Sequence, residues 1–308
     1  MEYDVAIIGG GPAGLSAAVY VLRAGHSAVI IEGTACGGQM LLAHEIENYP
    51  GFRKVTGMDL ADAMTEQAKA LGTKFMYRNV AEIRKSADGF SISAGKDTVE
   101  TKAVIVASGT ERRKLGIPEE DKWVGSGISY CAVCDGRFYQ NKDVAVIGGG
   151  NTALGDALYL SGICSSVTLI HRRDTFRADR VTVDRVRNTP NIRILTPMRV
   201  DSVLGDMAVR SLELVSTAPD KLSERMVLET GGVFVAVGSV PNTSFLGEMK
   251  NQICDESGYI RTDERCRTAV GGLFAAGDVR QKTLRQISTA VADGSIAGVE
   301  ASEYIDSL

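Results

Sequence analysis

The sequence contains one closely spaced cysteine pair, Cys131-Ala-Val-Cys134, which is followed directly by Asp135 and Gly136. Two thiols at this spacing can act as a dithiol–disulfide relay. In such a relay one thiolate attacks a disulfide sulfur and forms a mixed disulfide, which the neighbouring thiol then resolves. Asp135 is placed to supply or accept the proton that thiolate chemistry requires. The pattern therefore indicates redox exchange with a disulfide.

Two other interpretations of this pair are half of a zinc site or two core thiols. Structural zinc normally takes four nitrogen or sulfur ligands, and the chain has no second close cysteine or histidine pair and only 3 histidines. The redox interpretation is therefore favoured. The remaining cysteines are scattered, and each is expected to be a small buried hydrophobic residue: Cys36, Cys164, Cys254 and Cys266.

An internal repeat surrounds this pair. Residues 5–32 and residues 144–171 align without a gap. Each copy has a β-branched run, a glycine turn, an amphipathic helical segment and a second apolar run. This order is typical of a β-α-β unit whose glycine turn opens a helix that can hold a pyrophosphate at its N-terminus.

The first copy has the complete G-x-G-x-x-G pattern at Gly9, Gly11 and Gly14, and Glu32 closes its second strand. A carboxylate at that point can accept hydrogen bonds from a ribose 2′-hydroxyl. The pattern favours FAD or NAD over a glycine turn without a ligand.

The second copy has Gly148 and Gly150, but His171 stands where the first copy has Glu32. Three arginines follow His171, namely Arg172, Arg173 and Arg177. Guanidinium groups bind phosphate with bidentate geometry, whereas a carboxylate repels it. The exchange favours NADPH, and the alternative is a solvated basic edge.

The pattern of apolar residues predicts further elements around the two repeats. Strands are expected at 103–109, 233–238 and 273–278, and helices at 58–71 and 288–304. Short strands within 192–215 and at 226–228 are expected to form a smaller β layer. Proline-containing turns at 111–118 and 239–243 are the expected crossings between domains.

These elements predict an α/β protein with two Rossmann-like dinucleotide-binding domains, the second inserted into the first. Residues 1–113 and 244–308 form the expected FAD-binding domain, and residues 114–243 form the expected NADPH-binding domain with the cysteine pair. The length of 308 residues suits two domains.

Composition excludes several classes of function. The net charge is −4, and only 6% of the residues are aromatic, which argues against nucleic-acid binding. No apolar run approaches the length of a membrane span, and the acidic start has no signal-peptide pattern. The expectation is a cytoplasmic protein without a metal, a nucleic-acid partner or a membrane partner.

Taken together, the motifs resemble those of the low-molecular-weight bacterial thioredoxin reductases, over essentially the full length. The ordered set is far more specific than any one member. It comprises GGGPAG at 9–14, GGQ at 37–39, ENYPG at 47–51, CAVCDG at 131–136, GGGNTA at 148–153, HRRDTFR at 171–177, GSVPNT at 238–243, GD at 277–278 and RQISTA at 285–290.

The resemblance implies two cofactors. FAD would be held by Gly9, Gly11, Pro12, Ala13, Gly14, Glu32, Gly38, Gln39, Asn48, Gly109, Gly277, Asp278, Arg285, Gln286 and Ala290. NADPH would be held by Gly150, Asn151, Thr152, His171, Arg172, Arg173 and Arg177.

The resemblance also implies the roles of the thiols. Electrons would pass from NADPH through FAD and the redox-active Cys131–Cys134 disulfide to a thioredoxin-like protein. Cys134 would be the thiol nearest the flavin, Cys131 would attack the partner disulfide, and Asp135 would be the acid of the flavin–thiol step. The family is homodimeric.

One position departs from the family. A Glu-Glu pair usually follows the second glycine turn, and this chain has Gly155-Asp156 instead. The change removes a carboxylate near the expected nicotinamide position, but it leaves the phosphate-binding arginines in place.

Three rival functions follow from the same residues. The fold could use another electron donor, such as a ferredoxin. It could be a flavin-dependent dithiol oxidase, although that enzyme would not need Arg172, Arg173 and Arg177. It could also be a non-catalytic redox sensor that signals through the cysteine pair.

Overall fold

The computed structural model describes residues 1–43 and 45–308. It divides into two compact units. The first unit comprises Met1–Glu111 and Val240–Leu308, and the second comprises Arg112–Ser239. The second unit is thus an insertion into the first.

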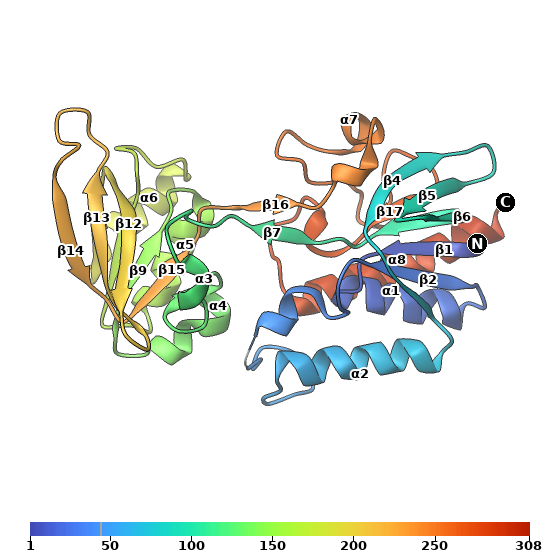
Figure 1. The fold of residues 1–308 in the computed structure, drawn as a ribbon, viewed down its shortest axis with the longest axis horizontal. Coiled ribbons are helices and arrows are strands. Elements are labelled where there is room, and N and C mark those ends of the chain that lie inside the picture. The colour runs from blue at the N-terminus through green and yellow to red at the C-terminus, as the bar shows by residue number, and fades with distance from the viewer. Residues whose placement is uncertain (44) are drawn as a thin grey trace. The chain divides into compact units, whose positions relative to one another are not determined.

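The first unit is built on a seven-stranded sheet (Figure 1). Its strands, in spatial order, are β3 (Lys74–Tyr77), β2 (Ala28–Glu32), β1 (Glu2–Ile8), β6 (Asp97–Val106), β5 (Phe90–Ala94) and β4 (Val80–Lys85), and β17 (Leu273–Ala275) also pairs with β6. Strand β1 pairs in parallel with β2 and β6, and β17 is parallel to β6. The carboxyl ends of these strands therefore meet at one edge, which is the usual ligand-binding edge of such sheets.

Alternation of side chains along β1 produces two hydrophobic cores. Val5 and Ile7 face helices α1 (Pro12–Arg23) and α8 (Ile287–Asp306), whereas Ala6 and Ile8 face the opposite core. All four side chains are almost completely buried. Burying an isoleucine contributes about 1.5–3 kcal/mol, so both faces of the central strand hold the sheet to its neighbouring layers.

Helices α1 and α8 approach each other closely at two glycines of α8. A Cβ atom on Gly294 would collide with the carbonyl oxygen of Ala13, and one on Gly298 would lie 2.7 Å from the carbonyl oxygen of Ala17. Glycine weakens a helix interior, so these positions are explained by the contact with α1. The contact fixes the start of α1, which is the first glycine turn.

The second unit has a five-stranded sheet and a separate three-stranded layer. The sheet order is β11 (Ile192–Leu195), β10 (Ser166–Ile170), β9 (Asp143–Ile147), β15 (Gly232–Val235) and β8 (Ile128–Ser129), and all recorded pairings are parallel. The layer consists of the antiparallel strands β12 (Met198–Gly205), β13 (Val209–Ser216) and β14 (Arg225–Glu229).

One strand prediction in this region is wrong. We expected all of 192–215 to belong to the smaller layer, but Ile192–Leu195 pairs in parallel with β10 in the main sheet. The sequence Thr196-Pro197 separates β11 from β12, and proline cannot donate a hydrogen bond to a sheet ladder. The break at Pro197 is therefore the point where the chain leaves one sheet for the other.

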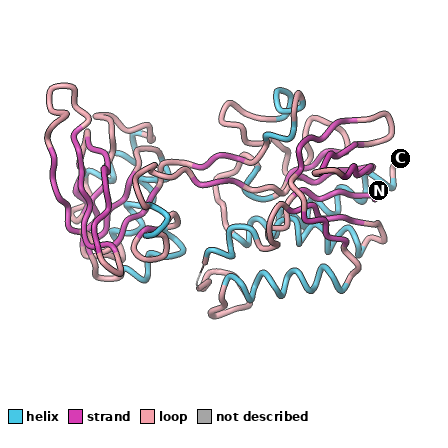
Figure 2. Tube along the Cα trace, viewed as in Figure 1, coloured by secondary structure: helices cyan, strands magenta, loops and turns pink. Residues whose placement is uncertain are grey.

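The faces of β9 are also divided between two cores. Val144 and Val146 pack with residues of helices α5 (Asn151–Ser161) and α6 (Arg180–Arg187), and Ala145 and Ile147 pack with the β12–β14 layer. Each unit thus places its sheet between two layers, and within these two sheets β4 and β5 of the first unit pair in an antiparallel manner. This arrangement confirms the predicted α/β fold with two Rossmann-like domains. Figure 2 shows that both units contain helices and strands.

The remaining elements are short, with the exception of α2. Strands β7 (Thr110–Arg112) and β16 (Ser239–Pro241), where the chain passes between the units, pair with each other. The others are η1 (Gly38–Leu42), α2 (Gly57–Ala70), α3 (Glu120–Trp123), α4 (Ala132–Asp135), η2 (Gly136–Tyr139), η3 (Ser244–Leu246), α7 (Met249–Ile253) and η4 (Gly277–Val279). Helices α2 and α8 confirm the two predicted helices.

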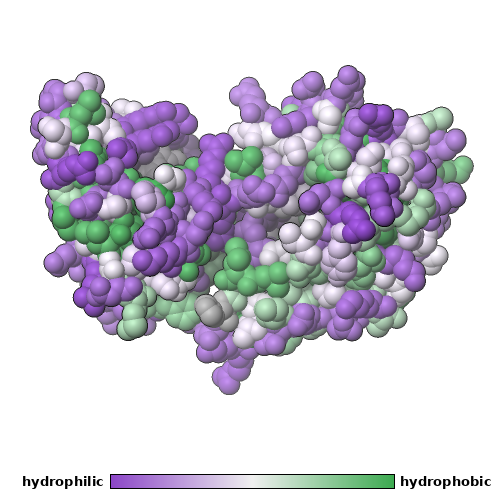
Figure 3. All heavy atoms as spheres, viewed as in Figure 1, coloured by the Kyte–Doolittle hydropathy of each residue, from purple (hydrophilic) through white to green (hydrophobic). Residues whose placement is uncertain are grey.

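Hydrophilic side chains cover most of the face drawn in Figure 3, and small hydrophobic patches lie between them. Across the described residues, no helix is both long enough and apolar enough to cross a membrane.

The two interior helix glycines Gly294 and Gly155 predict opposite responses to alanine. Gly294→Ala should destabilise the protein by roughly 1–3 kcal/mol, because α8 must move away from α1. Gly155→Ala should stabilise it by roughly 0.5–1 kcal/mol, because a Cβ there meets open space and alanine favours helix. Urea unfolding of each variant measures the shift. Equal stability of the Gly294→Ala variant and the parent protein would contradict the proposed tight crossing.

Candidate functional site

The first glycine turn connects β1 to α1, and its shape excludes side chains at two positions. Gly9 has a φ of +109°, and a Cβ atom there would collide with the carbonyl oxygen of Ala107. A Cβ on Gly14 would collide with the carbonyl oxygen of Gly9. These two glycines therefore make the turn possible, which is the structural part of the predicted motif.

Gly11 differs from these two glycines because no residue that the structure describes would collide with a Cβ atom there. Its hypothetical Cβ would have only the Cα of Gly38 nearby, at 3.9 Å. Gly11 is also the N-cap of α1, and no side chain caps it. An open glycine at an uncapped helix N-terminus fits a bound phosphate, because phosphate oxygens can take the free backbone N–H groups. The residues present thus fit the pyrophosphate of a dinucleotide.

Glu32 lies at the end of β2, where the sequence predicted a ribose-binding carboxylate. Its Oε2 accepts a hydrogen bond from the N–H of Gly10 at 2.8 Å, and its Oε1 accepts one from the N–H of Thr34 at 3.0 Å. The carboxylate therefore braces the loops after β1 and β2. A carboxylate oxygen has more than one acceptor site, so this bracing leaves Glu32 able to accept a ribose hydroxyl.

Three predicted FAD residues from distant parts of the chain meet beside this turn. A Cβ on Gly277 would lie 2.9 Å from the Cβ of Ala13 and 3.7 Å from the Cβ of Ala290. Gly277 has a φ of +78° and opens η4, the short turn after β17 that carries Asp278. The start of α1, the turn after β17 and the start of α8 are thus in contact, as a shared nucleotide site requires.

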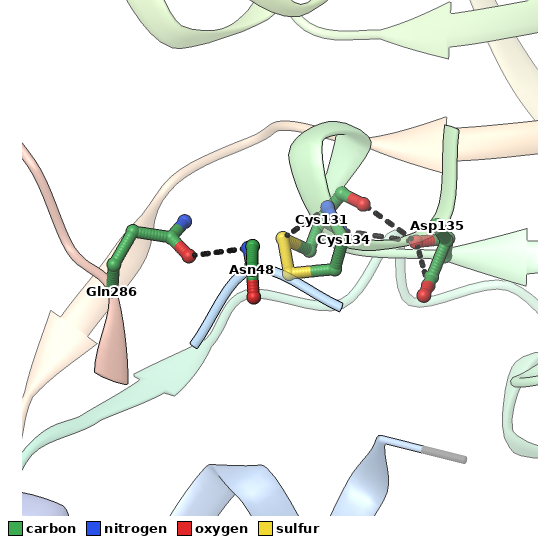
Figure 4. The surroundings of a disulfide bond; sticks show 6 residues. Asn48, Cys131, Cys134, Asp135 and Gln286 are labelled. Carbon is green, nitrogen blue, oxygen red and sulfur yellow. Dashed lines mark hydrogen bonds between the residues drawn. A yellow bond between two sulfur atoms is a disulfide. The ribbon is translucent and has the colours of Figure 1, made fainter. Parts of the chain in front are cut away.

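Other predicted FAD residues are held by hydrogen bonds within the first unit. The Nδ2 of Asn48 donates to the Oε1 of Gln286 at 3.1 Å (Figure 4), and the Nε2 of Gln39 donates to the carbonyl oxygen of Thr110 at 2.6 Å. Arg285 donates to the carbonyl oxygen of Asp278 at 3.3 Å. The Arg285 guanidinium also lies 4.3 Å from the ring centroid of Tyr259.

Pro12 is the first residue of α1, where its missing N–H costs nothing. Gly109 has a φ of +64°, and its carbonyl oxygen accepts the N–H of Asn242 at 3.1 Å. Pro12 follows β1 and Gly109 follows β6, so both lie at the carboxyl ends of neighbouring parallel strands. The predicted FAD residues therefore come from the segments that follow β1, β2, β6 and β17, from η1, from Asn48 and from the start of α8.

The second glycine turn repeats the first in the second unit. A Cβ on Gly148 would collide with the carbonyl oxygen of Ala236, whereas one on Gly150 would meet nothing within 4 Å. Gly150 is the uncapped N-cap of α5. The Asn151 side chain accepts the N–H of Asp179 at 2.8 Å, and Thr152 is exposed in the first turn of α5. The open space again lies where a pyrophosphate would bind.

The loop after β10 folds against this turn. The N–H of Arg177 donates to the carbonyl oxygen of Gly149 at 2.7 Å. The ring of His171 covers Gly149 so closely that any Cβ there would collide with it, and the ring stacks on Phe176 with a centroid distance of 5.5 Å. His171 is therefore part of the wall of the glycine turn.

Two properties of His171 describe its state in the wall of the turn. Burial lowers the pKa of His171, and the neighbouring charges of Arg173, Arg172 and Arg177 lower it further. The imidazole is thus neutral near pH 7. Its Nε2 atom is buried and has no hydrogen-bond partner among the described residues. Buried polar atoms normally have a partner, so a bound ligand is a candidate partner for this one.

Arg172, Arg173 and Arg177 are exposed. In the described ranges, 1–43 and 45–308, no ion pair joins them to a carboxylate. Their guanidinium groups are therefore available to an added phosphate. This property agrees with the predicted 2′-phosphate site and does not by itself distinguish it from a solvated basic edge.

The departure at Gly155-Asp156 lies on α5. Gly155 is exposed, and a Cβ there would meet open space. Burial raises the pKa of Asp156 to about 6. The helix therefore retains one carboxylate at this point, and Asp156 releases its proton only near neutral pH.

The predicted cysteine pair forms a disulfide. The two Cα atoms lie 5.3 Å apart, and Cys131 is the N-cap of helix α4 (Figure 4). The N–H of Cys134 donates to the Sγ of Cys131 at 3.2 Å. In the reduced state, the same N–H would favour the thiolate form of Cys131 over its thiol, because a hydrogen bond to the charged form lowers the pKa.

Asp135 is held beside the disulfide by Ser129, a residue that the sequence analysis missed. The Ser129 hydroxyl donates to the Oδ2 of Asp135 at 2.6 Å and accepts the N–H of Cys131 at 3.0 Å. Ser129 is only 4% exposed. A hydroxyl two residues before a cysteine is too common to single out, so only the contact reveals its role in fixing Asp135.

The surroundings of the disulfide are accessible and partly apolar. Cys134 is exposed, Cys131 is half-buried, and the side chains of Val133 and Phe138 are 44% and 51% exposed. Large exposed apolar groups beside a reactive pair suit contact with another protein surface.

The prediction for the remaining cysteines is confirmed at three positions and wrong at one. Cys164, Cys254 and Cys266 are buried free thiols. Cys36 is only half-buried, because it lies in the loop after β2 with its sulfur against Gly10. Burial nevertheless raises the pKa of the Cys36 thiol, so it is a poor nucleophile at neutral pH.

Comparisons with known proteins agree with this geometry. The family model for "Pyridine nucleotide-disulphide oxidoreductase" matches residues 3–294. A thioredoxin reductase from Listeria innocua is 43% identical over 307 residues, which cover 99% of this chain and 95% of the relative. The crystal structure of thioredoxin reductase from Streptococcus pyogenes has a TM-score of 0.91 at 39% identity and covers 100% of this chain and 99% of its own.

A ferredoxin-flavin thioredoxin reductase from Clostridium acetobutylicum is more distant. Its crystal structure is 30% identical with a TM-score of 0.54, covering 100% of this chain and 99% of its own. The resemblance inferred from the motifs is thereby confirmed. The chain belongs to the pyridine nucleotide-disulphide oxidoreductase family, and within that family to the group of thioredoxin reductases.

Proposed function

We propose that this chain is a thioredoxin-disulfide reductase that uses NADPH and FAD. The observation that carries the proposal is the accessible Cys131–Cys134 disulfide with Asp135 fixed beside it, in a chain that also has two open glycine turns. The dithiol would reduce the disulfide of a thioredoxin-like protein. The enzyme would act as a cytoplasmic homodimer.

FAD would be held at the first glycine turn by Gly9–Gly14, Glu32 and the residues that gather around Gly277. When bound, FAD supplies two-electron transfer between a nicotinamide and a disulfide. The chain contributes the N–H groups of the α1 N-terminus and the Glu32 carboxylate. It also contributes the close contact among Ala13, Gly277 and Ala290, which leaves no room for larger side chains.

NADPH would be held at the second turn. Gly150, Asn151 and Thr152 would present the α5 N-terminus to the pyrophosphate, and Arg172, Arg173 and Arg177 would hold the 2′-phosphate. The neutral His171 would offer its free Nε2 to the ligand. This assignment is favoured over NADH because a carboxylate is replaced by unpaired cations at the end of β10.

The order of the thiol steps is the one that the family resemblance implies. In the reduced pair, the Cys131 thiolate attacks one sulfur of the partner disulfide, so a mixed disulfide forms and the partner releases one thiolate. Cys134 then attacks the Cys131 sulfur and releases the second partner thiolate. The partner gains two electrons and takes up two protons, and the Cys131–Cys134 disulfide forms again. Asp135 would exchange a proton with the thiols.

A ferredoxin-type electron donor is the specific alternative to NADPH. The relative named for ferredoxin and flavin shares 30% of its residues with this chain, whereas the Listeria innocua thioredoxin reductase shares 43%. A ferredoxin-type donor has no 2′-phosphate for Arg172, Arg173 and Arg177 to bind. The same argument weighs against a dithiol oxidase, and turnover with a disulfide protein would exclude a pure redox sensor.

The FAD assignment is tested by exchanging the open glycines. Denatured protein should release FAD in a 1:1 ratio, as measured by chromatography. Gly11→Val should fold normally, because the Cβ would lie at an ordinary van der Waals distance of 3.9 Å from the Cα of Gly38, yet it should lose FAD affinity at least tenfold. The matched change Gly150→Val should leave FAD bound and weaken NADPH instead. A colourless parent protein that does not take up added FAD would overturn the assignment.

The thiol roles are tested by single serine variants. Cys131→Ser and Cys134→Ser should each abolish reduction of thioredoxin, while reduction of the flavin by NADPH stays intact. Only Cys134→Ser should remove a thiolate-to-flavin absorbance band. Asp135→Asn should slow reoxidation of the flavin by the disulfide without loss of FAD. The control Cys36→Ser should keep full turnover, and full turnover in either of the first two variants would make the pair structural.

The donor site is tested by removing two cations. Arg172→Ala combined with Arg173→Ala should raise the KM for NADPH at least tenfold and change the KM for NADH little. The reason is that a charged hydrogen bond contributes about 1.5–3 kcal/mol. The control pair Arg210→Ala and Arg225→Ala removes the same charge from the β12–β14 layer of the same unit. Equal effects of the two pairs on NADPH would contradict a specific phosphate site.

A further inference from the structure

A buried ion cluster lies within the first unit, at the base of the predicted FAD turn. Asp293 of α8 accepts hydrogen bonds from the Nη1 of Arg280 on Oδ1 and from the Nζ of Lys282 on Oδ2, each at 2.7 Å. The three side chains are only 12–13% exposed. Replacing a buried ion cluster with apolar residues is often neutral or stabilising, so stability alone does not explain why these charges are present.

The cluster is connected directly to the turn that carries Asp278. The Oδ2 of Asp293 also accepts the N–H of Gly277 at 3.0 Å. Gly277 is buried and opens η4. Without this carboxylate the N–H would lose its recorded partner in a buried site, and orphaned buried donors are rare. Asp293 thus sets the direction of the chain as it leaves β17.

The two cations extend the same restraint on both sides. Arg280 follows η4 and donates through Nη2 to the carbonyl oxygen of Asp263 at 3.0 Å. Lys282 donates to the carbonyl oxygen of Thr289, in the first turn of α8, at 3.3 Å. One carboxylate therefore ties the segment after β17 to the start of α8. These are two of the segments that meet the first glycine turn through Gly277 and Ala290.

From this geometry, and resting on the proposed FAD site, we infer that Asp293 is a positioning residue for FAD and that Arg280 and Lys282 hold it in place. Asp293 does not lie in the predicted set of FAD contacts. It fixes the backbone of Gly277, and through it the adjacent Asp278 and the spacing to Ala290.

The same helix supplies a matched control. Glu300 is also a buried carboxylate of α8, at 4% exposure, and it is also paired with two cations, Arg265 and Arg267. Glu300 accepts hydrogen bonds from those two arginines. Among the described residues, no hydrogen bond joins its side chain to the FAD turn. A purely structural role predicts equal behaviour of the two carboxylates, and a positioning role predicts that they differ in FAD affinity.

The test is to titrate FAD into apoprotein of Asp293→Ala, Asp293→Asn and Glu300→Ala, with flavin fluorescence as the measure of Kd. Melting temperatures of the same apoproteins are recorded in parallel. Asp293→Ala should raise the Kd at least tenfold. Asp293→Asn should raise it less, because its amide oxygen still accepts the N–H of Gly277. Glu300→Ala should stay within twofold of the parent even though its melting temperature falls.

An unchanged Kd in Asp293→Ala, or equal changes in Asp293→Ala and Glu300→Ala, would overturn the inference. If either alanine variant does not fold, Asp293→Asn and Glu300→Gln form the deciding pair, and the Kd must rise only in the former. FAD binding by the parent protein distinguishes a failure of the proposed function from a failure of the proposed role of Asp293. If it fails to bind FAD, the proposed function is wrong, whereas tight binding by the parent and by all variants contradicts only the role of Asp293.

Discussion

The architecture depends on the sharp turn from a parallel strand into a helix, where main chain packs directly on main chain. At Gly9 and Gly14 the backbone atoms of neighbouring segments occupy the space that any side chain would need. This contact aims the N-terminus of α1 along the edge of the sheet. The close packing of α8 against α1 then keeps that helix end in place. Gly11 can face a ligand only because the close backbone contacts at Gly9 and Gly14 hold the turn in its shape.

The second unit uses the same turn with a different chemical surface. Gly148 is sterically required and Gly150 is open, which repeats the arrangement of the first unit. The difference lies at the end of the next strand, where a carboxylate that braces two loops in one unit is replaced by a neutral imidazole and three exposed guanidinium groups in the other. One backbone design thus carries two different charge patterns, because the residues that set the shape are separate from those that set the charge.

Much of this was predictable because the signals are local. The glycine spacing, the exchange of Glu32 for His171 and the Cys131–Cys134 pair can each be recognised within a few residues. Sequence did not reveal Ser129, whose significance lies in two hydrogen bonds, nor the assignment of Ile192–Leu195 to the main sheet, which strand pairing decides. Asp293 was also missed. Its partners Arg280 and Lys282 resemble a solvated charged loop in sequence, and only folding buries them beside Gly277.

The cysteine pair closes a very small ring, because its members are three positions apart in the chain. A cross-link stabilises the folded state less when the loop that it closes is short, so this one contributes less to folding stability than a disulfide between distant residues would. The backbone bond from the N–H of Asp135 to the carbonyl oxygen of Cys131 does not depend on whether the sulfurs are joined. Folding stability therefore depends less on the oxidation state of this pair than it would on that of a long-range disulfide. Opening the bond thus costs the domain that carries it less stability than opening a disulfide between distant segments would.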